Sequence, residues 1–258
     1  MLLRRTLLAA LALAAGLAHA QAPDWKKVRI GIEGAYPPFS EIGTDGKLKG
    51  FDVDITMALC ARMGAECTLV QQEWDGMIPA LQARKFDAII SSMSITEERQ
   101  RQVAFSNKYY NTPARIVGKA TLAPNISVAA LKGKKIGVQR STTQDRYATA
   151  IYTGSQIVRY GKADEAFLDL AAGRVDVLLI DSVAADLGFL KRPAGKGFAF
   201  LGQPVDDPKY FGTGSGIAVR KADAALVQKF NAAIAAIRAD GSYKKIEAKY
   251  FDFDVFGQ

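Results

Sequence analysis

Apolar runs short enough for single β-strands alternate along this chain with apolar residues at helical spacing. The short runs predict strands at 28–32, 68–70, 88–90, 115–117, 136–138 and 216–220. The helical spacing predicts helices at 51–63, 77–83, 182–190 and 224–238, with a last helix or tail at 246–251. Strands and helices that alternate in this way are typical of an α/β fold.

Parts of this pattern occur twice. Residues 30–32 match residues 136–138, and the longer stretch 81–92 aligns with 170–181. We therefore expect two α/β units of similar plan, each built on a mostly parallel sheet. In sheets of this kind, ligands bind at the carboxyl ends of the strands.

Polar side chains gather at these expected strand ends in both units. In the first unit they are Glu33, Tyr36, Ser91, Ser92 and Ser94. In the second unit they are Thr142, Thr143, Gln144 and Asp181. Two units that face each other with such edges predict a ligand-binding cleft between them.

The stretch 87–99 combines a predicted strand, several hydroxyls and an arginine. Ser94 and Glu97 have the spacing of a capping box, which predicts a helix that begins at this point. A strand that leads into a helix N-terminus leaves backbone N–H groups free for an anion. Arg99, in the first turn of that helix, could then bind a carboxylate through two hydrogen bonds. The alternative interpretation is a capped helix with a solvated arginine.

The N-terminus has the pattern of a secretory signal peptide. Arg4 and Arg5 precede the apolar stretch 6–17, and Ala18-His19-Ala20 follows as a small-x-small cleavage site. The paired arginines suggest twin-arginine export, but the residues after them match that signal poorly, which favours the general secretory route. The apolar stretch is too short for an ordinary membrane span, and no later stretch is long enough. We expect cleavage after Ala20 and export of the mature chain.

Cleavage would remove His19, the only histidine of the chain. Ser-His-Asp and Cys-His catalysis would then be excluded, together with metal sites that need imidazole. We expect no cofactor and no metal. The net charge of +8 would fall to +6 with the loss of Arg4 and Arg5. The other basic residues are scattered among acids, so we do not expect nucleic-acid binding.

The two cysteines, Cys60 and Cys67, lie close together in the sequence. An oxidising compartment favours a disulfide between such a pair. Gly64 between them is typical of a helix C-cap, so the disulfide would join the end of a helix to the next strand. A redox function is disfavoured because the spacing is not Cys-x-x-Cys.

Together these motifs resemble a known family. The chain is similar to periplasmic amino-acid solute-binding proteins of ABC importers, in the lysine/arginine/ornithine- and histidine-binding group. The resemblance covers essentially the whole mature chain, through the segments 50–54, Cys60/Cys67, 87–96, Arg99, 141–144, 173–176 and 249–253. It implies a type II fold, in which two lobes joined by two crossings close on a ligand. Lobe 1 would be 23–111 plus 213–258, and lobe 2 would be 112–212.

The resemblance implies a site for the α-carboxylate of an amino acid. Arg99 would bind the carboxylate, helped by Ser92 and by the backbone of Thr142 and Thr143. Each residue also has a simpler interpretation. Ser92 would then form only local hydrogen bonds at a strand end. Thr142 would then belong to a plain turn or cap.

The resemblance also implies a site for the α-ammonium group. Asp181 would bind it, together with the Ser91 carbonyl and the Ser94 hydroxyl. A zwitterion needs one cation and one anion at a short, fixed separation, which Arg99 and Asp181 can supply. Asp181 could instead be only the N-cap of the helix at 182–190.

For the ligand side chain, the resemblance implies aromatic contacts from Tyr36 and Trp74. Glu33 and Gln144 would reach its distal end. Aromatic faces attract a cation at the end of an alkyl chain, and Glu33 would neutralise it. Relatives often have Asp in place of Glu33 and Phe in place of Trp74, whereas opine-binding relatives combine Glu and Trp.

The resemblance therefore implies a binding protein that is not an enzyme. The expected ligand is a cationic L-amino acid, arginine or ornithine before lysine or histidine, and the expected partner of this monomer is an inner-membrane ABC permease. A glutamine- or opine-type ligand is an alternative. A periplasmic dehydratase-like enzyme on the same fold is another, since a fold does not fix a function. A sensory role at a membrane receptor is a third.

Overall fold

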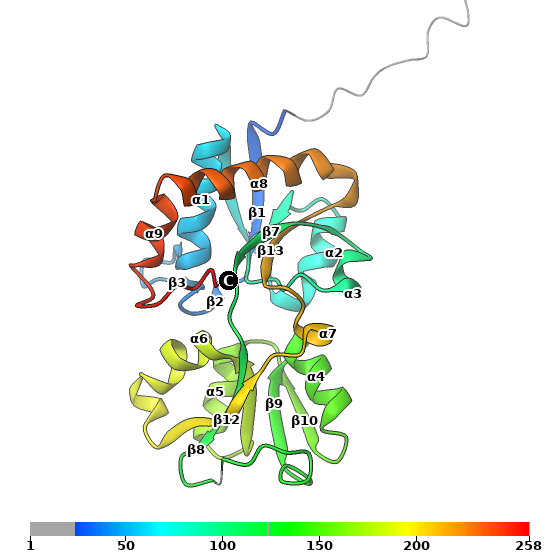
Figure 1. Ribbon diagram of the computed structural model, residues 1–258, viewed down its shortest axis with the longest axis vertical. Helices are drawn as coiled ribbons and strands as arrows, with labels where there is room; N and C mark the ends of the chain where they lie inside the picture. Colours follow the sequence, from blue (N-terminus) through cyan, green and yellow to red (C-terminus); the bar gives the residue numbers. More distant parts are fainter. Residues whose placement is uncertain (1–23, 123, 258) are drawn as a thin grey trace, which may run out of the picture.

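The chain forms two lobes, each built around a five-stranded sheet (Figure 1). The computed structural model describes residues 24–122 and 124–257. The predicted signal peptide, 1–20, lies outside the described residues. Among the helices that are described, none is long and apolar enough to cross a membrane.

The sheet of lobe 1 has strands in the order β5 (Glu66–Gln71), β1 (Lys27–Ile32), β6 (Ala88–Ile89), β13 (Ser215–Val219) and β7 (Ala104–Tyr110). The first three are parallel, and β13 is antiparallel to both of its neighbours. The helices of this lobe are α1 (Phe51–Met63), α2 (Met77–Gln82), α3 (Glu97–Gln100), α8 (Ala224–Ala239) and α9 (Ser242–Glu247). Two short 3-10 helices, Trp74–Gly76 and Lys221–Asp223, precede α2 and α8. A small sheet of β2 (Ala35–Tyr36), β3 (Ser40–Ile42) and β4 (Leu48–Lys49) follows β1.

The sheet of lobe 2 repeats this plan with the order β10 (Gln156–Tyr160), β9 (Lys135–Gln139), β11 (Val177–Asp181), β8 (Ala114–Lys119) and β12 (Phe198–Val205). Its helices are α4 (Thr143–Ile151), α5 (Ala163–Ala171) and α6 (Ser182–Ala185), which a π-helix, Asp186–Leu190, and a 3-10 helix, Pro193–Gly195, follow. The chain passes from lobe 1 to lobe 2 after β7. It returns between β12 and β13 through α7 (Pro208–Phe211). We propose the lobe boundaries 23–111 plus 213–258 and 112–212.

The predicted internal repeat is confirmed by the strand register. Gly31 pairs with Ile89 in lobe 1, and Gly137 pairs with Leu178 in lobe 2, at the positions that the sequence match aligns. A side chain on Gly31 would meet the ring of Phe86, and one on Gly137 would meet Leu178. Both glycines are therefore required for close packing against the sheet.

One predicted helix start is wrong. The N-cap of α3 is Thr96, whose hydroxyl accepts a hydrogen bond from the Arg99 N–H at 3.3 Å, and not Ser94. Ser94 instead forms an isolated β-bridge with Ser215. The chain stays extended beyond β6 because it pairs with the segment before and at the start of β13, which sequence spacing does not reveal.

The predicted disulfide between Cys60 and Cys67 is present and joins the last turn of α1 to β5. Gly64 is the C-cap in the left-handed conformation, with φ 62°, as the sequence predicts. The disulfide therefore constrains the connection between the helix and the edge strand of lobe 1.

Replacing both cysteines with serine is expected to lower the free energy of unfolding by about 2–3 kcal/mol, because a short loop in the unfolded chain is no longer closed. Urea denaturation of the mature protein with and without reductant measures this. The double variant should not respond to reductant. An unchanged wild-type midpoint after reduction would contradict the prediction.

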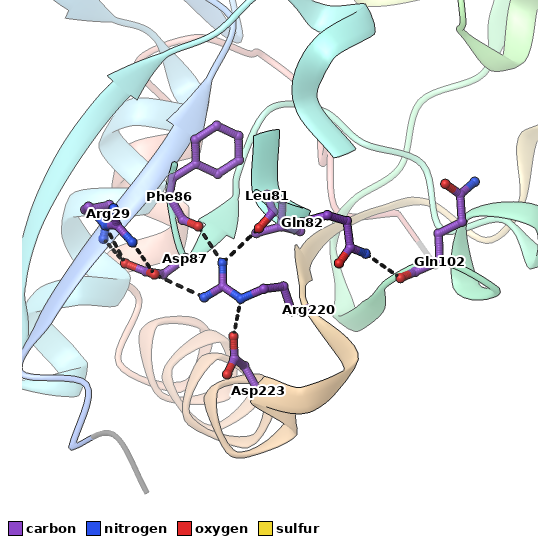
Figure 2. A network of polar contacts seen from close by, with 8 residues as sticks. All are labelled: Arg29, Leu81, Gln82, Phe86, Asp87, Gln102, Arg220 and Asp223. Atoms are coloured by element: carbon purple, nitrogen blue, oxygen red, sulfur yellow. Dashed lines mark hydrogen bonds and ion pairs between the residues drawn. The ribbon is translucent and has the colours of Figure 1, made fainter. Parts of the chain in front are cut away.

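A buried arginine fixes the end of the lobe 1 sheet that lies away from the strand carboxyl ends (Figure 2). Arg220, 5% exposed, donates to the carbonyls of Leu81 and Phe86 at 3.0 and 2.6 Å. It also pairs with Asp223 at 2.6 Å and with Asp87 at 3.1 Å. These bonds tie the C-terminus of α2 and the start of β6 to β13, and so set the position of the residues that follow β6.

Arg220→Met is expected to lower the free energy of unfolding by about 3–5 kcal/mol, because the carboxylates of Asp87 and Asp223 each lose an ion-pair partner in a buried site. Chemical denaturation measures the change. Arg29→Met is the matched control. Arg29 also pairs with Asp87, but its side chain is 47% exposed, so the expected cost is about 1 kcal/mol or less. Equal costs for the two variants would contradict the prediction.

Candidate functional site

A cavity of about 680 Å³, measured with the open solvent at its mouth, lies between the lobes at the strand carboxyl ends. All the residues that the sequence predicts for the site line it: Glu33, Tyr36, Trp74, Ser91, Ser92, Ser94, Arg99, Thr142, Thr143, Gln144 and Asp181. The two α/β units thus bring their polar edges together, as the repeated pattern predicts.

Further residues line the cavity that sequence reasoning does not find. They are Tyr110, Asn111, Thr112, Ala114, Gln139, Asp206, Phe211, Gly212, Gly214 and Ser215. Most belong to the two crossings between the lobes and their flanking strand ends. Their only sequence signal is their place between the two units, since a crossing has no periodic pattern of its own.

Arg99 is the buried cation of the cavity, at 7% exposure. Its guanidinium donates to the carbonyl of Ser94 at 3.1 Å and, across the cavity, to that of Ser141 at 3.4 Å. It also lies 5.2 Å from the centre of the Trp74 ring. Burial, with a smaller effect of Arg146, lowers the pKa of Arg99 to about 10. Within the described residues no carboxylate forms an ion pair with it, so it can accept an anion from outside.

Asp181 is a buried acid at the end of β11, and it is also the N-cap of α6. One carboxylate oxygen accepts hydrogen bonds from the N–H groups of Val183 and Ala184 at 2.8 and 3.0 Å. The other accepts from the hydroxyl of Thr112. Burial raises the pKa of Asp181 against these hydrogen bonds. The described residues provide no cation in an ion pair with it, so the cap leaves its charge uncompensated.

Glu33 is a second buried acid, at 5% exposure, immediately after β1. The amide of Gln139, from the other lobe, donates to its carboxylate at 2.6 Å. Burial raises the pKa of Glu33 to about 7, and the bond from Gln139 opposes this rise. In the part of the chain that the structure describes, Glu33 has no ion pair either. Gln139 is thus a residue of the site that sequence reasoning missed.

The three serines after β6 have different partners. The Ser91 hydroxyl accepts from the Glu33 N–H at 3.0 Å. The Ser92 hydroxyl donates to Asp52 at 2.9 Å. The Ser94 carbonyl is the acceptor for Arg99. The hydroxyls of Ser91 and Ser92 thus bind residues far away in the sequence and not the local partners of the simpler interpretation, and both serines line the cavity.

At the start of α4, Thr142 is the N-cap, as its simpler interpretation predicts. Its hydroxyl accepts from the Asp145 N–H at 3.1 Å and donates to the Gln139 carbonyl at 2.6 Å. The Thr143 hydroxyl donates to the Gln144 side chain at 3.0 Å. With both hydroxyls occupied, the backbone N–H groups at this helix N-terminus are what the turn offers to an anion.

Trp74 opens a 3-10 helix and is 9% exposed, in the same apolar cluster as Met77. It is therefore part of the core and of the cavity wall at once. Tyr36 also lines the cavity and stacks on Phe39, with ring centres 5.9 Å apart. Both aromatic side chains add apolar surface to a cavity whose lining also holds buried charged groups.

Two ion pairs cross between the lobes beside the cavity. Arg140 contacts Asp75 at 2.6 Å, and Arg146 contacts Glu98 at 2.6 Å. Both pairs are partly exposed, so each adds little stability by itself. Together with the Gln139–Glu33 bond, they join the lobes across the cavity in this structure.

Comparison with known proteins identifies the family. The model of bacterial extracellular solute-binding proteins, family 3, matches residues 28–253. The chain belongs to this family. An L-arginine-binding protein of Pseudomonas aeruginosa is 59% identical over 234 residues, 90% of each chain. A lysine/arginine/ornithine-binding periplasmic protein of Escherichia coli is 47% identical over 232 residues, 89% of each chain.

A solved structure supports the same assignment. A periplasmic binding protein of Salmonella typhimurium, described as having high arginine specificity, matches with a TM-score of 0.81 and 35% identity over 88% of this chain and 99% of that one. The predicted type II two-lobe fold is confirmed. The prediction of a binding protein that is not an enzyme is confirmed too, because the family and these relatives are solute-binding proteins. Such proteins bind small amino-acid ligands and deliver them to ABC permeases.

Burial of Glu33 makes the stability of the ligand-free protein depend on pH. Because its pKa is higher in the folded state, the folded protein binds this proton more tightly than the unfolded chain. The free energy of unfolding should therefore fall as the pH rises from about 4.5 to about 7, by about 3 kcal/mol for this group. Glu33→Gln is expected to remove that part of the fall.

Urea denaturation at a series of pH values compares the wild type with Glu33→Gln and with Glu97→Gln. Glu97 is exposed, so its replacement should leave the wild-type slope unchanged. Identical slopes for the wild type and Glu33→Gln would show that the carboxyl is not held in a desolvated site.

Proposed function

We propose that this chain is the periplasmic receptor of an ABC importer and binds a cationic L-amino acid, with arginine as the first choice. One observation carries this proposal. The cavity holds one buried arginine and two buried acids, Arg99, Asp181 and Glu33, without ion pairs among the described residues. A ligand with one carboxylate and two cations would complete all three charges.

We assign the ligand α-carboxylate to Arg99. The guanidinium is supported by carbonyls and by the Trp74 ring, which orient it while leaving it positive. The Ser92 hydroxyl and the backbone of Thr142 and Thr143 would add donors. An arginine suits this role because its planar group can form two parallel bonds to a carboxylate.

We assign the α-ammonium group to Asp181, with the Ser91 carbonyl and the Ser94 hydroxyl as further acceptors. Asp181 keeps its position because two backbone N–H groups of α6 bind one of its oxygens. An ammonium group would bring the positive charge that this buried acid lacks. A ligand without a free α-ammonium, such as an opine, would leave Asp181 uncompensated.

The side chain of the ligand would lie between Tyr36 and Trp74 and reach Glu33, with Gln144 and Gln139 beside it. A guanidinium has five N–H donors and fits a carboxylate flanked by amide oxygens. Because a cation would neutralise the charge of buried Glu33, we expect the cavity to prefer a ligand with a cationic side chain over glutamine, whose side-chain amide is neutral. The sequence identity of 59% to an L-arginine-binding protein supports arginine among the cationic amino acids.

The mechanism that we propose is closure of the lobes around the ligand. Arg99 and Glu33 belong to lobe 1, and Asp181 and Gln144 to lobe 2, so a bound ligand would stabilise the closed form, which the permease would recognise. The protein would act as a monomer, without cofactor or nucleic acid, after cleavage of its signal peptide.

Calorimetric titration of the refolded, ligand-stripped mature protein tests the proposal. L-arginine is expected to bind with one-to-one stoichiometry and more tightly than L-ornithine, L-lysine, L-histidine, L-glutamine or octopine. Arg99→Met and Asp181→Asn should each weaken arginine binding by about 30-fold or more, because each leaves a buried charge of the ligand without its partner.

Arg101→Met is the matched control, because Arg101 is exposed at the C-cap of α3 and does not line the cavity. It should leave the affinity unchanged. Preference for glutamine or octopine would keep the binding function but overturn the assignments of Glu33 and Asp181. No binding of any of these compounds would overturn the proposed function.

A further inference from the structure

A buried carboxyl lies against Ser92 in the cavity wall. Asp52, in the first turn of α1, is fully buried. The phenol of Tyr109 donates to one of its oxygens at 2.8 Å, and the hydroxyl of Ser92 donates to the other at 2.9 Å. The N–H of Ser92 in turn donates to the Tyr109 oxygen at 3.1 Å. The three residues form a closed set of hydrogen bonds with one edge at the cavity.

Asp52 has no ion pair among the described residues. The other titratable groups around it are Tyr36, Tyr110 and Tyr243 and the carboxyl of Glu33, none of which carries a positive charge. Burial raises the pKa of Asp52 to about 7, against the bonds from Tyr109 and Ser92. Both protonation states are therefore accessible near neutral pH.

Ser92 needs support to keep its backbone conformation. Its φ is +55°, in the left-handed region that residues with a side chain rarely adopt. The two bonds to the Asp52 and Tyr109 side chains hold both its N–H and its hydroxyl in this conformation. The conformation also leaves Ser92 on the wall of the cavity.

The protonation of Asp52 decides where the single hydrogen of the Ser92 hydroxyl can go. An ionised Asp52 can only accept, so Ser92 must donate to it and presents lone pairs to the cavity. A protonated Asp52 can donate to the Ser92 oxygen instead. The Ser92 hydrogen is then free for a carboxylate in the cavity, which itself has only acceptors.

We propose that Asp52 is a positioning residue for the ligand α-carboxylate. It holds Ser92 in place and, when it is protonated, it frees the Ser92 hydroxyl to donate to the ligand. This inference rests on the proposed function of the cavity. Ligand binding would then take up a proton at Asp52, and this contribution to affinity falls as the pH rises through neutrality. Glu33 contributes with the opposite sign, because a cationic side chain favours its ionised form.

The experiment is a calorimetric titration with L-arginine near neutral pH, in two buffers that differ in ionisation enthalpy, which counts the protons exchanged per ligand. Comparison of the wild type with Asp52→Asn isolates Asp52 from Glu33. The amide that this substitution introduces has the size of the carboxyl and can donate permanently to Ser92. The proton count should shift toward release by about half a proton per ligand at pH 7, because about half of Asp52 is ionised there.

The affinity of Asp52→Asn for L-arginine should match that of the wild type at pH 6. At pH 8 it should exceed the wild-type affinity by up to about tenfold, because Asp52 of the wild type is then ionised and weakens binding of the ligand carboxylate. Ser92→Ala should lose the same proton uptake, because the link to the ligand is gone. Asp54→Asn is the matched control on the same helix, where Asp54 binds Lys249 and Tyr250 instead, and its proton count should equal that of the wild type.

Tyr109→Phe provides a test that does not depend on the folding of Asp52→Asn. It removes one hydrogen bond to the ionised form of Asp52, which should raise the pKa of Asp52. The pH range in which ligand binding takes up a proton should therefore move upward. Arginine binding with an unchanged proton count in Asp52→Asn, or with an unshifted pH range in Tyr109→Phe, would overturn this inference alone. A wild type that does not bind arginine would overturn the proposed function and the inference together.

Discussion

Charge that is buried without a counter-charge dominates the energetics of the cavity. Arg99, Asp181 and Glu33 all line it, and the described residues offer none of them an ion pair. Such charges are costly to desolvate, so each is held by neutral groups: carbonyls and an indole ring for Arg99, helix N–H groups for Asp181, and an amide for Glu33. These neutral partners fix the positions of the charged groups but do not neutralise them, so the groups can still form ion pairs with a ligand.

The repeated α/β plan explains how one cavity receives both signs of charge. The two sheets present equivalent strand ends to each other, and the residues at those ends have diverged. After β6 the chain continues into the serines and Arg99, whereas β11 ends in Asp181 and continues into α6. A ligand between the sheets therefore meets a cation from one lobe and an anion from the other, so that binding and contact between the lobes are coupled.

Much of this could be predicted because it depends on short-range patterns and shared motifs. The alternation of strands and helices, the disulfide, the Gly64 cap and every predicted cavity residue follow from neighbours in the sequence or from the family resemblance. The capping box at Ser94 was wrong for a physical reason. Ser94 and Glu97 have the right spacing, but Ser94 pairs with Ser215 at the start of β13, far later in the chain, and this long-range pairing keeps it extended.

The amino-acid sequence alone specifies the class of site: two lobes, strand ends that face each other and charged residues at those ends. How those charges are held depends on the folded arrangement of the lobes. Gln139 directly follows the strand predicted at 136–138 and becomes the partner of Glu33 only when the lobes meet. Asp52 resembles an ordinary acid in a first helical turn until Tyr109 and Ser92 enclose it. Burial and hydrogen-bond partners set the protonation of such groups, and both arise from segments that are distant in the chain.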